Sequence, residues 1–317
     1  MFAQPSFPKE IFFEVTNACN LNCTMCARGK MQRKIGYMPF DLFCKAINQI
    51  KHLPQTIITM HGLGEPLMHP ELPAMIRYAK SLHFRRVSFN TNGLLLNPKM
   101  MNKLINSGLD HLTFSLDSAT ARFYNPDCKA DLSLLDKKIV DFVARRNKLK
   151  SHKPKIKLQF VYSDSTREQA LFFKQKWKNK VDRVILKRLL RWPVKVHRKT
   201  KPKTPVRIIC ANQMLQAVIQ WNGQVISCCL SKENFLDTGV SLGNLYNTSL
   251  KEIFIGENRQ RLLKDQFRGD YRAVPSCINC PEWVDYFAPL LFSKGSLRQR
   301  LQAKATALTS KRDNVQR

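Results

Sequence analysis

Six short apolar runs recur along the first 190 residues, and most are followed by a longer segment whose apolar positions repeat at helical spacing. The runs lie at 11–15, around Ile57, and at 87–93, 112–118, 156–162 and 183–186. Helix-like stretches cover 41–53, 70–83, 98–107, 119–149 and 166–178. Strands that alternate with helices in this way are typical of a parallel sheet. The pattern predicts an α/β fold, with about six βα units forming an open, partial (β/α)6 barrel.

A different pattern follows a proline-containing break at 193–205. The apolar run 217–221 precedes Asn222-Gly223, a dipeptide typical of a tight hairpin turn, and a second apolar run follows it. We therefore expect a barrel over 1–192, a basic linker over 193–208 and a small second domain over 209–285. The polar, basic tail over 286–317 has the composition of a partly disordered segment.

Three cysteines follow the first predicted strand at C-x3-C-x2-C spacing: Cys19, Cys23 and Cys26. A [4Fe–4S] cluster takes one thiolate for each iron, so three cysteines leave one iron open for a ligand that the protein does not supply. A zinc knuckle is the alternative, but it normally pairs two cysteine hooks and completes four ligands. The spacing favours the iron–sulfur cluster.

Polar or glycine-containing segments end the next three predicted strands. The first is Gly64-Glu65-Pro66, the second contains Asn90 and Asn92, and the third contains Ser115 and Asp117. Parallel sheets place ligand contacts at the carboxyl ends of their strands. Glycine also lets a ligand approach the backbone closely. These seven residues are therefore candidates for holding a cofactor or a substrate.

A second group of cysteines lies in the C-terminal part, at Cys210, Cys228, Cys229, Cys277 and Cys280. The last two form a C-x2-C hook of the kind that holds zinc or iron–sulfur clusters. Because the chain already carries one predicted cluster, a second iron–sulfur site is the better interpretation.

The order of these motifs resembles the radical S-adenosylmethionine (radical SAM) superfamily. The resemblance implies that Cys19, Cys23 and Cys26 hold a [4Fe–4S] cluster whose open iron binds S-adenosylmethionine. Reductive cleavage then gives a 5′-deoxyadenosyl radical that abstracts hydrogen from a substrate carbon. It also implies that the strand-end residues named above hold S-adenosylmethionine, although Leu63 replaces the first glycine of the family's usual pair.

The C-terminal part resembles the SPASM domain and its shortened "twitch" form. That resemblance implies one auxiliary [4Fe–4S] cluster held by Cys210, Cys228, Cys277 and Cys280, with Cys229 as a substitute ligand. The expected activity is that of an oxidoreductase with a reducing partner such as flavodoxin or ferredoxin. A small carbohydrate or aminocyclitol-like substrate is favoured, because peptide maturases more often carry a fuller set of cysteines. A peptide or protein maturase, a tRNA-modifying enzyme and a non-catalytic iron–sulfur protein that binds nucleic acid are the alternatives.

Composition and charge add the compartment and one class of partner. Ten cysteines without an apolar signal segment predict a cytoplasmic protein, and no apolar run is long enough for a transmembrane segment. The net charge is +30, and residues 145–207 hold 22 Lys and Arg against three acidic residues. Such a field favours an anionic partner, either nucleic acid or a phosphorylated substrate. Substrate contacts are expected at 162–164 and at Lys187 and Arg188, whereas no catalytic side chain is assigned.

Overall fold

The computed structural model describes residues 7–23, 26–116, 132–189, 210–228 and 241–274, together with Cys277 and Cys280. Six strands alternate with helices in its first part, as the apolar pattern predicts. The strands are β1 (Glu10–Phe13), β2 (Ile57–Thr59), β3 (Arg86–Thr91), β4 (His111–Leu116), β5 (Lys155–Tyr162) and β6 (Arg183–Arg188). The helices are α1 (Phe40–Asn48), α2 (Leu72–Ser81), α3 (Pro98–Ile105), α4 (Leu132–Lys148) and α5 (Arg167–Trp177), with short 3-10 helices η1 (Ala27–Lys30), η2 (Pro66–Met68) and η4 (Asp164–Thr166).

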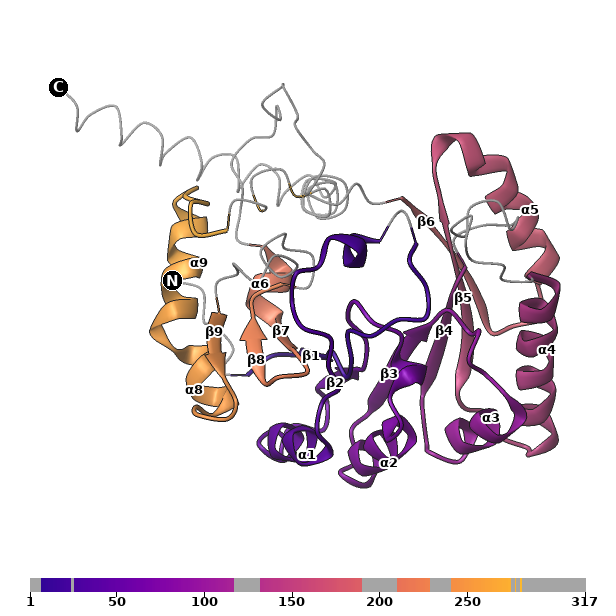
Figure 1. The fold of residues 1–317 in the computed structure, drawn as a ribbon, viewed down its shortest axis with the longest axis horizontal. Coiled ribbons are helices and arrows are strands. Elements are labelled where there is room, and N and C mark those ends of the chain that lie inside the picture. The colour runs from indigo at the N-terminus through magenta and orange to yellow at the C-terminus, as the bar shows by residue number, and fades with distance from the viewer. Residues whose placement is uncertain are drawn as a thin grey trace, which may run out of the picture.

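The described strands form one sheet in the order β6-β5-β4-β3-β2-β1-β7-β8-β9. Strands β1 to β6 are parallel, and each pairs with the next one along the chain. Figure 1 shows α1 to α5 along the outer side of this curved sheet, whereas the long loop after β1 lies on the other side. The predicted α/β fold with a partial barrel is therefore confirmed.

Burial alternates along the central strands β3, β4 and β5. One set of side chains is fully buried with the helices in a single core, and it includes Val87, Phe89, Leu112, Phe114, Ile156, Leu158 and Phe160. The intervening side chains are partly exposed, and they point to the opposite face of the sheet because strand side chains alternate. We call that opposite face the lumen face. It is the surface available for ligands inside the barrel.

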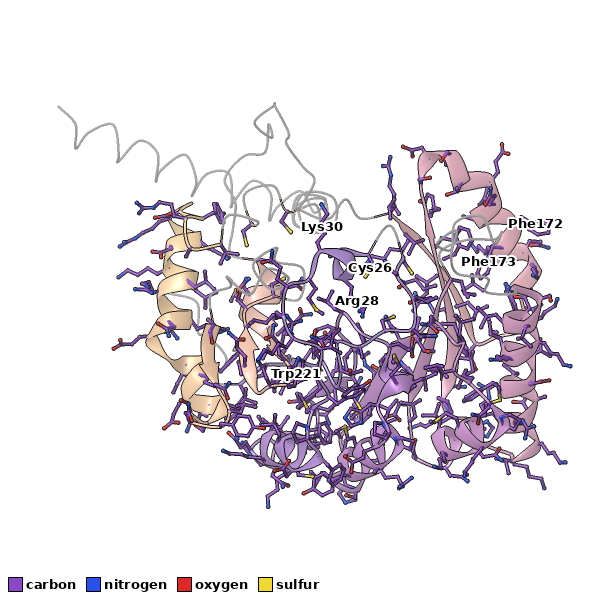
Figure 2. The ribbon with its side chains drawn as sticks, in the orientation of Figure 1. Cys26, Arg28, Lys30, Phe172, Phe173 and Trp221 are labelled. Carbon is purple, nitrogen blue, oxygen red and sulfur yellow. The ribbon has the colours of Figure 1, made fainter. Side chains whose placement is uncertain are left out.

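Helix α5 shows how the outer layer packs. Phe173 is 4% exposed, and its ring lies 4.9 Å from that of Phe160 on β5. Its neighbour Phe172 is 68% exposed and points away from the sheet (Figure 2). The helix thus buries one face and solvates the other.

The C-terminal part continues the barrel sheet. It contains α6 (Ala211–Leu215), β7 (Gln216–Ile219), β8 (Gln224–Ile226), β9 (Ser241–Asn244), α8 (Leu250–Ile255) and α9 (Glu257–Phe267). Strand β7 pairs in parallel with β1, and β8 and β9 follow in antiparallel order. The predicted turn at Asn222-Gly223 is confirmed as the link between β7 and β8, and Gly223 has a φ of +80°, which favours glycine.

No helix in the described ranges is both long enough and apolar enough to cross a membrane. The boundaries predicted near 192, 208 and 285 lie outside the described residues, as does the tail. The domain limits therefore stay predictions.

Candidate active site

The loop between β1 and α1 carries Cys19, Cys23 and Cys26, all partly exposed. Cys26 caps η1, and its Sγ accepts a hydrogen bond from the Arg28 N–H at 3.5 Å. The Leu21 N–H donates to Cys19 Sγ at 3.4 Å. Burial raises the pKa of the Cys19 thiol, whereas the Leu21 N–H and the Arg28 charge act against that shift. Backbone donors aimed at sulfur stabilise thiolates, so this loop suits thiolate ligation of a metal cluster.

Two kinds of metal site can be compared for the cysteine loop, a mononuclear zinc site and an iron–sulfur cluster. Among the described residues, no three Cys, His, Asp or Glu side chains converge as they would around one metal ion. A four-iron cluster holds each thiolate on a different iron, so its ligands do not meet at one point. The choice of an iron–sulfur cluster over a zinc ion therefore rests on the C-x3-C-x2-C spacing of the three cysteines.

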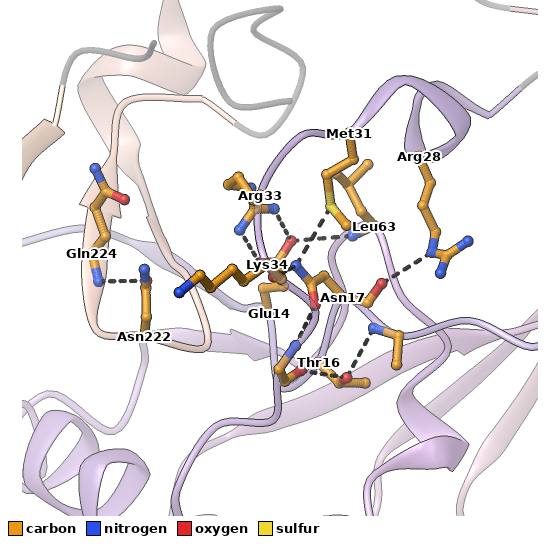
Figure 3. A network of polar contacts seen from close by, with 12 residues as sticks. Glu14, Thr16, Asn17, Arg28, Met31, Arg33, Lys34, Leu63, Asn222 and Gln224 are labelled. Carbon is orange, nitrogen blue, oxygen red and sulfur yellow. Dashed lines mark hydrogen bonds and ion pairs between the residues drawn. The ribbon is translucent and has the colours of Figure 1, made fainter. Parts of the chain in front are cut away.

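A buried ion pair supports the base of this loop (Figure 3). The Arg33 guanidinium donates to both carboxylate oxygens of Glu14, at 2.8 Å each. Both side chains are less than 5% exposed, and Glu14 also accepts the Leu63 N–H at 3.4 Å. Two parallel charge-assisted hydrogen bonds fix the direction of both groups. The pair thus connects the end of β1, the far side of the cysteine loop and the segment after β2.

Asn17 and Thr16 close the same loop from within. The Asn17 amide donates to the Lys34 carbonyl and accepts the Gly36 N–H, both at 2.8 Å. Thr16 Oγ1 donates to the Gly36 carbonyl at 2.7 Å. In addition, Arg28 Nε donates to the Asn17 carbonyl at 3.0 Å (Figure 3). These bonds span 11 to 20 residues of chain and hold the cysteine loop in one shape.

The C-terminal part touches this loop through Trp221. A Cβ built on Gly36 would lie 2.5 Å from three Trp221 ring atoms, so the indole lies flush against the Gly36 backbone. Trp221 follows β7, next to the hairpin turn (Figure 2). The second domain thus packs directly on the loop that carries the first cysteine group.

Gly64 lies against the backbone just before Cys19. A Cβ there would come within 2.3 Å of the Thr16 carbonyl oxygen and 2.6 Å of the Ala18 carbonyl oxygen. The next residue, Glu65, donates its N–H to that same Ala18 carbonyl at 2.8 Å. Glycine is required here for close approach of two backbones. The predicted Gly64-Glu65-Pro66 segment and the cysteine loop therefore lie in contact.

The Glu65 side chain joins the segment after β2 to the end of β3. It is 3% exposed and accepts hydrogen bonds from Thr91 Oγ1 at 2.7 Å, the Asn92 N–H at 2.8 Å and the Leu67 N–H at 3.1 Å. Burial raises the pKa of Glu65, and these three donors oppose the rise. Because its oxygens are engaged inside the protein, Glu65 positions the strand ends. Pro66, which is also buried, begins η2 directly after it.

The other predicted residues in the described ranges lie at the end of β3 and on the lumen face of the sheet. The Asn92 amide donates to Asn20 Oδ1 in the cysteine loop at 2.9 Å, which connects the end of β3 to that loop. Asn90 and Ser115 lie on the lumen face of β3 and β4. Asp117 lies outside the described residues.

His61, which follows β2, was not predicted as a site residue. Its ring lies edge-on to Phe12 with centroids 5.5 Å apart, and its buried Nδ1 has no hydrogen-bond partner. Burial and the Lys187 charge on β6 together lower the His61 pKa to about 4.

The C-terminal cysteines also gather. Burial raises the pKa of Cys210 to about 12, and the nearby sulfurs of Cys228 and Cys280 add to that rise. Cys277 packs against the core, and its Sγ is 3.8 Å from Gln266 Nε2. A cationic iron–sulfur cluster would deprotonate thiols that share such a site and would neutralise the resulting thiolate charges. Cys229 lies outside the described residues.

Sequence reasoning missed the supporting network around the first cysteine group. Glu14, Arg33 and Trp221 carry no motif, and their contacts join positions far apart along the chain. The sequence did indicate the lumen face, because apolar and polar residues alternate along β3 to β5 and this alternation identifies the polar side chains that share a face.

Comparisons with known proteins agree with this geometry. The model of the radical SAM superfamily matches residues 13–139, and that of the SPASM iron–sulfur cluster-binding domain matches residues 210–281. A Pyrococcus furiosus protein named as modifying the cofactor of tungsten-containing aldehyde ferredoxin oxidoreductase is 26% identical over 314 residues, covering 86% of this chain and 87% of its own. The AdoMet-dependent heme synthase of Methanosarcina barkeri is 33% identical over 127 residues, which is 39% of this chain and 36% of the relative.

Solved structures show the same fold. BtrN in complex with AdoMet and 2-DOIA has a TM-score of 0.58 at 18% identity and matches 88% of this chain and 94% of its own. Streptococcus suis SuiB bound to S-adenosylmethionine has a TM-score of 0.61 at 15% identity and matches 87% of this chain and 71% of its own.

The fold and the two cysteine groups define an iron–sulfur enzyme built on a partial α/β barrel. The chain belongs to the radical SAM superfamily and carries a C-terminal SPASM domain. Its cofactors are S-adenosylmethionine and a [4Fe–4S] cluster, with auxiliary iron–sulfur chemistry in the SPASM domain. The non-catalytic alternative is thereby set aside.

Proposed function

We propose that Cys19, Cys23 and Cys26 hold the catalytic cluster and that the chain oxidises a small polar substrate. The observation that carries this proposal is the contact between the cysteine loop and the strand ends, where Gly64 packs on the loop backbone and Asn92 bonds to Asn20. A reduced [4Fe–4S] cluster held by these three cysteines would supply the electron for radical chemistry with S-adenosylmethionine, and so the means to remove a hydrogen from a substrate carbon.

The residues at the strand ends near the cysteine loop have distinct proposed roles. Gly64 packs closely on the cysteine loop, which would place backbone carbonyl oxygens near the ammonium group of S-adenosylmethionine. The Glu65 side chain holds this backbone in place by accepting the Asn92 N–H. Asn90, Asn92 and Ser115 offer polar side chains at the lumen face and the strand ends. Asp117 remains a candidate on the resemblance alone.

We assign the auxiliary cluster to Cys210, Cys228, Cys277 and Cys280. The mutual effect of Cys228 and Cys280 on the Cys210 pKa supports a shared site, and the SPASM match covers all four positions. A fully ligated cluster has no open iron, so electron transfer during substrate oxidation suits it better than substrate binding. A flavodoxin or ferredoxin would supply the first electron.

A small substrate is favoured over a peptide. The relative matched over most of its length is named as acting on a cofactor, and the BtrN match extends over 94% of that chain. Two structures with a bound peptide are matched over 66% (SuiB) and 86% (anSMEcpe) of their length. A peptide substrate is the second candidate, since the SuiB fold is equally similar by TM-score.

The test is anaerobic reconstitution followed by incubation with dithionite and S-adenosylmethionine. The wild type should contain about eight irons and release 5′-deoxyadenosine, because each of two clusters holds four irons. The Cys19/Cys23/Cys26→Ala variant should fall to about four irons and release none. Cys44→Ala is the matched control, since Cys44 lies on α1 and has no part in either group.

Two results would sink the assignment. One is deoxyadenosine formation by the triple variant at the wild-type rate, and the other is loss of iron in Cys44→Ala equal to that in the triple variant. Candidate small substrates and peptides are then compared by the extra deoxyadenosine that each one elicits.

A further inference from the structure

One row of side chains crosses the lumen face in the middle of the barrel. The strand register places Asn90 beside Thr113, Thr113 beside Lys157, and Lys157 beside Arg183. All four positions share the face turned away from the helices, because burial alternates along β3 to β5 and because Val184 and Leu186 of β6 pack against the core. Lys157 and Arg183 therefore lie at the depth of Asn90, two residues below Asn92. Two residues of strand correspond to about 7 Å.

Further cations surround Lys157. Arg86 begins β3 on the same face, and its charge and that of Arg183 both lower the Lys157 pKa, although burial has the larger effect. Lys157 Nζ lies 2.7 Å from His111 Nδ1 on β4. Three cations from β3, β5 and β6 thus act on one another across the lumen.

The nearby acidic groups are engaged elsewhere. Glu10 accepts from Thr59 and Gln216, Asp110 pairs with Lys80 and Lys153, and Asp182 pairs with Arg146 and Lys155. Within the described ranges, Arg86 and Arg183 have no carboxylate partner, and the buried Nε of Arg86 has no hydrogen-bond partner at all. A cluster of like charges without a counter-charge is unfavourable unless an anion joins it.

His111 adds a neutral donor to the cluster. Burial and the Lys157 and Arg86 charges together lower its pKa to about 4, although the Asp110 charge opposes the shift, so the ring is neutral at pH 7. Because a lysine ammonium can only donate, His111 Nδ1 must accept the bond from Lys157. The proton of the neutral ring is therefore on Nε2.

We propose that Arg86, Lys157, Arg183 and His111 form a phosphate-binding site in the barrel lumen. Three cations and a neutral imidazole donor match the charge of a phosphate dianion better than that of a carboxylate, and arginine binds phosphate oxygens in pairs. Arg86 lies six residues before Asn92 along the chain, and His111 pairs with Ser88, four residues before Asn92, so the site lies towards the amino ends of the strands. The site does not rest on the proposed function.

The experiment measures binding of inorganic phosphate and of glycerol 3-phosphate to the reconstituted protein by calorimetry. Ionic strength is fixed with sodium chloride, and acetate and glycerol serve as reference ligands. The wild type should bind both phosphates saturably and acetate at least tenfold more weakly. Lys157→Met and Arg86→Gln should each weaken phosphate binding at least tenfold. Lys174→Met on the exposed face of α5 removes the same charge and should bind like wild type.

Folding of the variants is checked by thermal unfolding. Removing a cation from a repelling cluster should leave Tm equal or higher in phosphate-free buffer, while the rise in Tm on adding phosphate is lost. Tighter binding of glycerol 3-phosphate than of inorganic phosphate would identify an ester as the ligand, and the reverse order would identify free phosphate. Binding of phosphate no tighter than acetate, or equal loss in Lys174→Met, overturns the site. Deoxyadenosine release, measured separately, reports on the proposed function whether or not phosphate binds.

Discussion

The buried Glu14–Arg33 pair gives the sharpest prediction about how the cysteine loop is held. Replacing Arg33 by Met leaves the Glu14 carboxylate buried, with only the weak 3.4 Å bond from the Leu63 N–H. Removing one partner of a buried ion pair typically costs about 3–5 kcal/mol of unfolding free energy, because the other charge stays uncompensated. Both side chains are less than 5% exposed, so solvent screening does not reduce this effect.

The assay is anaerobic urea unfolding combined with iron counting. We expect Arg33→Met to lose about 3–5 kcal/mol and to bind less iron at the first cysteine group. The double variant Glu14→Leu/Arg33→Met removes both charges and should recover part of the lost stability, since apolar replacement of a buried pair is often neutral. Its iron content should nevertheless stay low, because the connection between β1 and the far side of the loop is still missing.

A matched control is the exposed pair of Arg188 and Asp164, whose side chains are 69% and 82% exposed. Arg188→Met should cost less than about 1 kcal/mol. Equal costs for Arg33→Met and Arg188→Met would refute the reasoning. The single variant Glu14→Leu completes the cycle, and a double variant whose loss equals the sum of the losses in Glu14→Leu and Arg33→Met would also refute it, because coupling between the two groups is the basis of the prediction.

Three further predictions concern the same region. Gly64→Ala should abolish loading of the first cluster, since the added Cβ would lie 2.3 Å from a carbonyl oxygen. Gly29→Ala is the control, because its Cβ would have no contact below 3.4 Å and the variant should load iron normally. Equal iron contents in the two variants would contradict this prediction. Trp221→Ala should loosen the loop at Gly36, seen as faster amide exchange around the first cysteine group, and unchanged exchange would show that the contact is incidental. His61 has a folded pKa near 4 against 6.5 unfolded, so the unfolded state binds more protons between these values and stability falls as pH drops through them. His61→Phe should lose less stability from pH 7 to pH 5 than wild type in urea unfolding, and identical slopes would rule the effect out.

Much of the barrel follows from local pattern. The predicted helix over 98–107 is observed as Pro98–Ile105, where Asn97 caps the helix by accepting the Met100 N–H. The strand predicted over 156–162 is observed as Lys155–Tyr162. Both depend on periodicity and on capping chemistry that are written within a few residues.

Contacts between distant segments could not be predicted in the same way. The sequence does not indicate that β7 pairs with β1 and so continues the barrel sheet, because register between segments 200 residues apart depends on the whole fold. The sequence does not indicate that the Glu65 side chain bonds to Thr91 and Asn92 at the end of β3, and its predicted role at the cofactor stays a prediction. Arg86, Lys157 and Arg183 become one cluster only once the strand register is known.

The most direct test of the central claim is electron paramagnetic resonance of the dithionite-reduced protein with and without S-adenosylmethionine. The account predicts that S-adenosylmethionine changes one of two [4Fe–4S]⁺ signals, because only the cluster with three cysteine ligands has an open iron. That change should persist in a Cys210/Cys228/Cys277/Cys280→Ala variant and vanish in Cys19/Cys23/Cys26→Ala. A wild-type spectrum that S-adenosylmethionine leaves unaltered, or a change that survives loss of the first three cysteines, would contradict the assignment.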